Sequence, residues 1–110
     1  ITEREHGVFS ERTTLGEEGC VIASLTVDLQ NYEVVATPTV LSKGWLNDGI
    51  AREFESEIED ILLEEIEELL AVHDQITQDL LRQRVRRVTG GYVNERTKRR
   101  PMIIPIVDLV

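Results

Sequence analysis

Pro101 separates a basic segment near the C-terminus from an apolar one. Proline disfavours the α conformation in the residue before it, so a helix that carries the basic side chains ends no later than Arg100. Residues 102–107 are apolar and predict a short strand. Pro105 places that strand at a sheet edge or at a bulge, because proline donates no ladder hydrogen bond. The chain therefore closes with a helix followed by a strand.

Two further strands are predicted in the first half of the chain. Apolar side chains alternate over residues 20–29, which is typical of a strand with one buried face. Residues 28–31 supply a tight polar connection, and residues 32–41, rich in β-branched side chains, return as the second strand of a hairpin. Pro38 predicts that this second strand is bulged or lies at an edge.

Two helices are predicted between the hairpin and the last strand. Apolar residues recur at helical spacing from about Ile50 to Val72, with glutamates on the remaining faces. After a break at residues 73–74, the stripe of a second helix is formed by Ile76, Leu80, Val85, Val88 and Tyr92. Gly90 and Gly91 each cost about 1 kcal/mol relative to alanine, so the second helix either ends there or continues under tertiary packing.

The predicted fold is α+β with the order β-β-α-α-β, a three-stranded sheet covered on one face by a helical hairpin. The first strand is the best candidate for the central position, since it alternates without interruption and contains no proline. The last strand then pairs with it in parallel, and direct pairing with the second strand is the alternative. Residues 1–18 lack a sustained period and are expected to be a linker or arm of a preceding domain, with residues 19–110 as one domain.

Charge is unevenly distributed along the chain. The net charge of −9 argues against nucleic-acid binding over the whole surface. Acidic side chains crowd residues 53–68 and basic ones follow over residues 82–100, so the domain is expected to have two electrically different faces. Neither a membrane span nor a signal peptide is predicted. The single cysteine, Cys20, is expected to be a buried structural residue and fits a cytoplasmic location.

No catalytic residue and no metal ligand is predicted in this chain. Its two histidines, His6 and His73, lack the carboxylate arrangement of a hydrolytic zinc site, and the glutamate stripe is expected to be a solvated face. The candidate contacts to RNA phosphates or to another domain are Arg96, Lys98, Arg99 and Arg100. The alternative is that these cations balance the helix dipole or pair with glutamates of the first helix.

Three separated elements occur in an order that is typical of a known family. They are the strand at residues 20–28, the loop formed by Ser42, Lys43, Gly44 and Trp45, and the basic run before residues 101–105. With these elements the chain, from about Thr14 to Val110, resembles the C-terminal domain of the ribonuclease J family. That family usually has Ser-Arg-Gly-Phe in the loop, so this chain keeps the charge and the aromatic ring but not the guanidinium group.

The resemblance implies a parent enzyme with a metallo-β-lactamase domain, an inserted β-CASP domain and two catalytic zinc ions. Such a parent acts on RNA as a 5′-to-3′ exoribonuclease and endoribonuclease in RNA processing and decay. It also implies a second helix that continues to about Thr97. This domain is expected to have no cofactor and no catalytic ligand of its own. It is expected to dock on the catalytic core of the same or the partner subunit, and thereby to support both enzyme activity and assembly of a homo-oligomer such as a homodimer. A second hypothesis is a stand-alone acidic α/β adaptor that binds a basic protein through its first helix.

Overall fold

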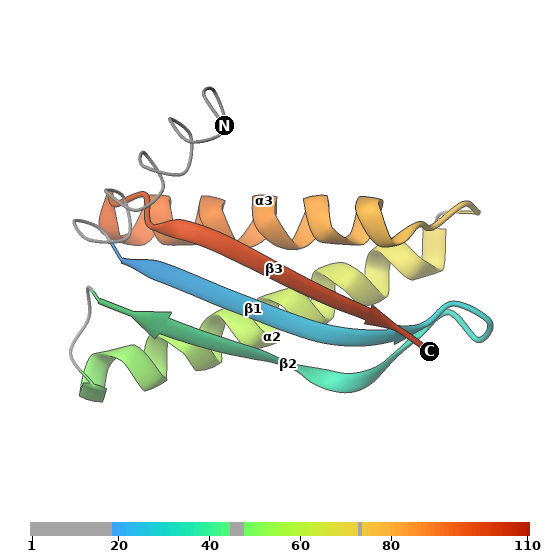
Figure 1. Cartoon of the computed structure of the whole chain (residues 1–110), viewed down its shortest axis with the longest axis horizontal. Helices are drawn as coiled ribbons and strands as arrows, with labels where there is room; N and C mark the ends of the chain where they lie inside the picture. The colour runs from blue at the N-terminus through green and yellow to red at the C-terminus, as the bar shows by residue number, and fades with distance from the viewer. Residues whose placement is uncertain (1–18, 45–47, 73) are drawn as a thin grey trace, which may run out of the picture.

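The computed structural model describes residues 19–44, 48–72 and 74–110. Within these described residues, five elements follow one another (Figure 1), namely β1 (Cys20–Asp28), β2 (Glu33–Lys43), α2 (Asp48–Val72), α3 (Gln78–Thr97) and β3 (Met102–Leu109). The strands form one mixed sheet, and both helices pack against the same face of it. The predicted α+β fold and its β-β-α-α-β order are confirmed. The predicted arm at residues 1–18 lies outside the described residues.

The sheet has the strand order β2-β1-β3. β1 is antiparallel to β2 and parallel to β3, so the expectation of a central first strand with a parallel third strand is confirmed. The pairing of β1 with β2 shifts register between Ser24 and Val27, and Pro38 lies in the opposing part of β2. Pro38 and Pro105 therefore both lie in edge strands, where proline is tolerated because its missing N–H group need not pair with a neighbouring strand.

The core lies between the sheet and the two helices. Every second side chain of β1 points towards the helices and is buried, because successive residues of a strand face opposite sides. The fully buried large side chains include Val21, Val27, Val40, Ile58, Leu62, Ile66, Leu69, Leu81, Val85 and Val93. Each such side chain contributes roughly 1.5–3 kcal/mol relative to an exposed position, so this layer holds the domain together.

The buried stripe of α3 shares Val85 with the predicted stripe and is otherwise shifted from it by one position. Its buried residues are Leu81, Val85, Thr89 and Val93. Leu80, Val88 and Tyr92, which the sequence placed on this stripe, are only half-buried beside it. The sheet sets this rotation, since α3 packs mainly on β3 and its core-facing line must point at that strand.

The ends of α3 are fixed by local hydrogen bonds. Thr77 caps the first turn, since its Oγ1 accepts a hydrogen bond from the Leu80 nitrogen at 3.1 Å. The helix continues through Gly90 and Gly91 to Thr97, as the family resemblance implied. Lys98 ends the helix in the left-handed region with φ 62°, and its N–H donates to the Asn94 carbonyl at 2.8 Å.

Cys20 is half-buried, so the expectation of a buried core thiol is wrong. Val21 faces the helices, and the alternation of β1 turns the neighbouring Cys20 side chain to the other face of the sheet. None of the described helices is long and apolar enough to cross a membrane.

Candidate interdomain interface

The structure turns Arg96 back towards α2. Its guanidinium Nη2 lies 3.9 Å from Glu57 Oε1, and Nη1 donates a hydrogen bond to the Tyr92 hydroxyl at 3.2 Å. The Tyr92 hydroxyl in turn donates to the same Glu57 oxygen at 2.5 Å. Burial, followed by the Glu57 carboxylate, raises the pKa of Tyr92, because both disfavour the phenolate. Arg96 thus helps to join the two helices.

The other predicted basic contacts lie beyond the end of α3. Lys98, Arg99 and Arg100 are all exposed in the turn that leads to β3. The backbone of this turn is held by Thr97, whose Oγ1 accepts from the Arg99 nitrogen at 3.1 Å, and by the Lys98 cap. The turn therefore presents three exposed cations that closely follow Arg96 in the chain.

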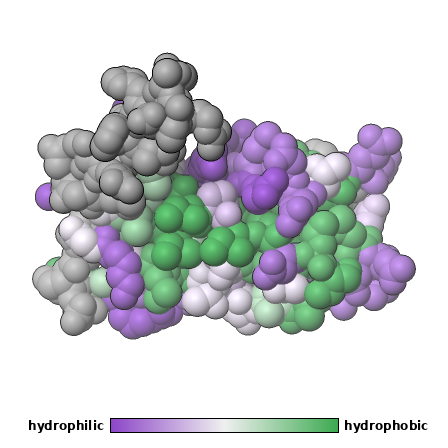
Figure 2. Space-filling view, in the orientation of Figure 1, coloured by the Kyte–Doolittle hydropathy of each residue, from purple (hydrophilic) through white to green (hydrophobic). Residues whose placement is uncertain are grey.

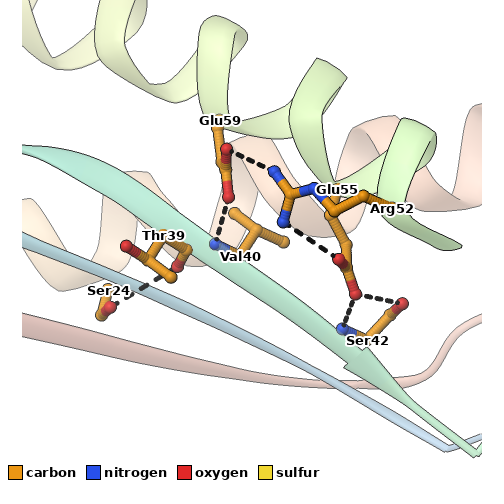
Figure 3. A network of polar contacts seen from close by, with 7 residues as sticks. All are labelled: Ser24, Thr39, Val40, Ser42, Arg52, Glu55 and Glu59. Atoms are coloured by element: carbon orange, nitrogen blue, oxygen red, sulfur yellow. Dashed lines mark hydrogen bonds and ion pairs between the residues drawn. The ribbon is translucent and has the colours of Figure 1, made fainter.

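The loop formed by Ser42, Lys43, Gly44 and Trp45, which we call the family-motif loop, begins inside β2 and is anchored to α2. Glu55 Oε2 accepts hydrogen bonds from the Ser42 nitrogen at 2.6 Å and from Ser42 Oγ at 2.9 Å (Figure 3). Gly44 has φ 88°, a left-handed conformation that favours glycine, so the motif glycine has a backbone role. Lys43 is exposed at the end of β2, and Trp45 lies outside the described residues. In this part of the motif, Ser42 and Gly44 have structural roles.

A second glutamate of α2 completes this contact. Glu59 Oε2 accepts a hydrogen bond from the Val40 nitrogen at 2.9 Å, and Arg52 bridges the Glu55 and Glu59 carboxylates at 3.3 and 2.9 Å (Figure 3). β2 is an edge strand, so the N–H groups of Val40 and Ser42 have no described strand to pair with on that side. The helix thereby closes the β2 edge. Two glutamates of the predicted solvated face have this internal role.

The two zinc ions of the implied parent do not fit the described part of this chain. No three His, Cys, Asp or Glu side chains gather as a metal-binding group within residues 19–44, 48–72 and 74–110. His6 and His73, the two histidines of the sequence, lie outside the described residues.

The face of the sheet opposite the helices is covered by no described element and carries an apolar patch. Register partners on neighbouring strands share a face. Leu41, Ile22 and Ile104 therefore form one row across β2, β1 and β3, while Cys20 with Met102 and Ser24 with Ile106 form the adjacent rows. We call this set, Cys20, Ile22, Leu41, Met102, Ile104 and Ile106, the open-face patch. Figure 2 shows apolar side chains gathered over this side of the sheet.

The open-face patch is accessible in the isolated chain. Leu41 and Ile106 expose 42% and 43% of their surface, and Cys20, Ile22, Met102 and Ile104 are half-buried. Contiguous exposed apolar patches are typical of interaction surfaces, since their burial excludes water from apolar area.

Sequence reasoning did not identify the open-face patch, although a signal was present. Residues 102–107 are apolar without alternation, a pattern that is typical of strands buried on both faces. The two helices cover only one of those faces. The uninterrupted run in β3 thus indicates a second contact.

These elements define the class of the domain: an α+β fold in which two helices cover one face of a three-stranded mixed sheet and the opposite face is apolar. The family follows from comparison with known sequences. A profile of the ribonuclease J C-terminal domain matches residues 7–109, and the chain belongs to this family.

Curated relatives agree with this membership. The chain is 31% identical over 105 residues to ribonuclease J 2 of Staphylococcus aureus strain NCTC 8325 / PS 47. The aligned region covers 92% of this chain and 18% of the relative. Ribonuclease J 2 of Staphylococcus epidermidis matches with the same identity and coverage, 31% over 105 residues, 92% of this chain and 18% of the relative. The chain thus spans about a fifth of the length of these relatives.

Proposed function

We propose that this chain is the non-catalytic C-terminal domain of a ribonuclease J-like enzyme and that it supports the assembly and activity of that enzyme by docking through the open-face patch. The observation that carries the proposal is β3, which is apolar on both faces while the helices cover only one. Burying the second face yields roughly 25 cal/mol per Å² of apolar surface, a driving force for a stable contact.

In this proposal the rest of the enzyme supplies the chemistry. A metallo-β-lactamase domain with an inserted β-CASP domain holds two zinc ions and hydrolyses RNA in the cytoplasm as a 5′-to-3′ exoribonuclease and endoribonuclease. Family membership and the ribonuclease J 2 relatives support this assignment. The open-face patch docks on the catalytic core of the same or the partner subunit and favours a homo-oligomer.

The assembly role is tested with Ile106→Asp in the whole enzyme. Ile106 is on the open-face patch at an edge strand, so a carboxylate there leaves the core intact but makes docking costly. We expect a lower molar mass by light scattering across a concentration series, or a lower specific activity on RNA at unchanged mass if the contact is within one subunit. The matched control is Val72→Asp, which places the same charge at an exposed valine at the end of α2. It should change neither the molar mass nor the specific activity. Unchanged mass and activity in Ile106→Asp would remove the proposal.

The absence of catalysis in this domain has its own test. The isolated chain should hydrolyse no RNA with added zinc or manganese. EDTA-sensitive cleavage by a preparation free of contaminating nuclease would overturn the non-catalytic assignment.

We also propose that Lys98, Arg99 and Arg100, next to Arg96, form an accessory contact to RNA phosphates or to the neighbouring domain. Their exposure in one turn supports this. Replacing Arg99 and Arg100 by Glu in the whole enzyme should weaken RNA binding and reduce the slope of log affinity against log salt by roughly 0.7–0.9 per lost phosphate contact. An unchanged slope assigns the turn to the interdomain contact instead.

A further inference from the structure

A groove of about 740 Å³ lies between α3 and β3, and it borders the open-face patch at Met102 and Ile104. Residues 102–105 form its apolar β3 side, and Asp79, Arg82, Gln83 and Arg86 line it from α3. Figure 2 shows the apolar side chains of the sheet bordered by hydrophilic side chains at the level of α3. The groove thus has one apolar wall and a polar wall on which two arginines outnumber one aspartate.

The β3 wall of this groove is a strand edge that no described strand covers. The Met102 and Val110 nitrogens donate to Gly19 and Val27 carbonyls of the β1 side, both at 3.1 Å. Because peptide groups alternate along a strand, those of Ile103 and Pro105 point away from β1, where no described strand lies. Pro105 has no N–H, so the edge offers the Ile103 N–H and two carbonyls for pairing.

The two edges of the sheet differ in how they are closed. On β2, glutamates of α2 accept hydrogen bonds from the Val40 and Ser42 nitrogens. On β3, Gln78 Nε2 donates to the Val107 carbonyl at 2.6 Å and closes the far end of the strand. Residues 103–105 lie at the groove and make no side-chain hydrogen bond of this kind with any described residue. They are therefore the part of the sheet that remains open to an added strand.

The arginines give this edge a charge preference. Arg82 pairs only with Asp79 of its own helix among the described residues, at 2.9 Å between exposed side chains, an arrangement worth a few tenths of a kcal/mol. Arg86 forms no ion pair with any residue that the structure describes. In a domain of net charge −9, these two cations beside a free strand edge favour a carboxylate-bearing partner.

The spacing of the arginines matches the period of a strand. Arg82 and Arg86 are four residues apart on a helix, which separates them by about 6 Å along its axis. Alternate side chains of an extended chain repeat at about 6.7 Å. α3 runs antiparallel to β3 (Figure 1), so an added strand on β3 lies alongside α3 and its carboxylates at positions i and i+2 match the axial spacing of Arg82 and Arg86.

We propose that this groove binds an extended peptide segment with acidic residues at alternate positions, which adds to the free edge of β3 and pairs with Arg82 and Arg86. The apolar side chains between the acidic ones face the open side of the sheet, beside Met102 and Ile104. A peptide fits the groove better than RNA does. Its backbone satisfies the strand edge, and no aromatic side chain among the described residues lines the groove to stack a base.

The test uses the chain and a fluorescein-labelled hexapeptide in which glutamate alternates with valine or threonine. Fluorescence polarisation should show saturable binding, and Arg86→Glu should weaken it at least tenfold. Arg87→Glu is the matched control, because Arg87 is an exposed arginine of the same helix that does not line this groove. It should weaken binding less than threefold. Far-UV circular dichroism of both variants checks that the fold is retained.

A second probe isolates the strand pairing without altering the protein. The same peptide N-methylated on the backbone of its central residues keeps its charge but cannot form the ladder, so its affinity should fall at least tenfold. No saturable binding up to 1 mM peptide at about 0.1 M salt, equal losses for Arg86→Glu and Arg87→Glu, or undiminished binding of the methylated peptide would each overturn the proposal. Tighter, Arg86-dependent binding of an oligouridine than of the peptide would overturn it in favour of RNA.

Discussion

Glu55 joins α2 to the edge of β2 through Ser42, whose backbone nitrogen lies 2.6 Å and whose Oγ lies 2.9 Å from Glu55 Oε2. Glu55 is only 6% exposed. A buried carboxylate is retained where it accepts several hydrogen bonds, and here it also accepts one from Arg52 at 3.3 Å. Ser42, the first residue of the family-motif loop, thereby has a physical role, the attachment of the first helix to the sheet.

Glu55→Ala should destabilise the domain. The substitution leaves the Ser42 N–H and hydroxyl without their acceptor, which costs about 1–3 kcal/mol of unfolding free energy in urea denaturation. Glu53→Ala, on the same helix and exposed, should change it by less than about 0.5 kcal/mol. Equal stabilities of the two variants would show that the Glu55 contact contributes nothing.

Thr89→Val should stabilise the domain. The Thr89 side chain is fully buried in α3, and its Oγ1 has no hydrogen-bond partner among the described residues. Valine has the same shape without the hydroxyl, so the unfolding free energy should rise by about 1 kcal/mol. Thr89→Ser keeps the hydroxyl and loses the methyl group, and it should lower the same quantity by about 1 kcal/mol. A Val variant less stable than the parent chain would indicate a hydrogen bond at this hydroxyl.

Gly91→Ala should also stabilise the domain, by up to about 1 kcal/mol, because alanine is the better helix former. An added Cβ at Gly91 meets nothing within 4 Å. Gly44→Ala is the opposing control, since Gly44 has φ 88° and a side chain there costs about 1–2 kcal/mol. Thermal unfolding of both variants measures the difference, and a destabilised Gly91→Ala would mean that α3 does not continue through this glycine.

The stability of the domain should decrease at alkaline pH through Tyr92. Its pKa is raised in the folded state by burial and by Glu57. The contribution of the neutral Tyr92 hydroxyl to the free energy of unfolding is therefore fully present below pH of about 10. It is lost as the pH rises through the raised pKa of the folded state. Phenolate absorbance in a Tyr32→Phe background reports Tyr92 alone, and a midpoint at or below about 10 would contradict the assignment.

Local patterns in the sequence predicted the elements but not all of their limits. β1 could be predicted from its alternation and α2 from its helical spacing. In each of them one face packs on the core, and this face sets the spacing of the apolar residues. β2 extends to Lys43 and β3 to Leu109, beyond the predicted ends at residues 41 and 107. These extensions depend on pairing with β1, which supplies partners as far as Cys20 and Val27 and is not visible in either strand alone.

The surfaces that support function could be predicted less well, since each is assembled from distant segments. The open-face patch requires Leu41, Ile22 and Ile104 to be in register, and register follows from the packed sheet. The pairing of Arg96 with Glu57 similarly depends on the rotation of α3, which differs by one position from the predicted stripe. The uninterrupted apolar run of β3 was the one local sign of a second contact.

The most direct test of docking through the open-face patch uses two chemical probes that the chain already contains. Cys20 and Met102 are its only cysteine and methionine, they are register partners, and both are half-buried on the open face. The measurement is the rate of Cys20 alkylation and of Met102 oxidation, followed by peptide mass spectrometry, in the isolated chain and in the whole enzyme. If the open-face patch docks on the catalytic core, both rates should fall at least fivefold in the whole enzyme, and equal rates in the two proteins would contradict docking through this patch.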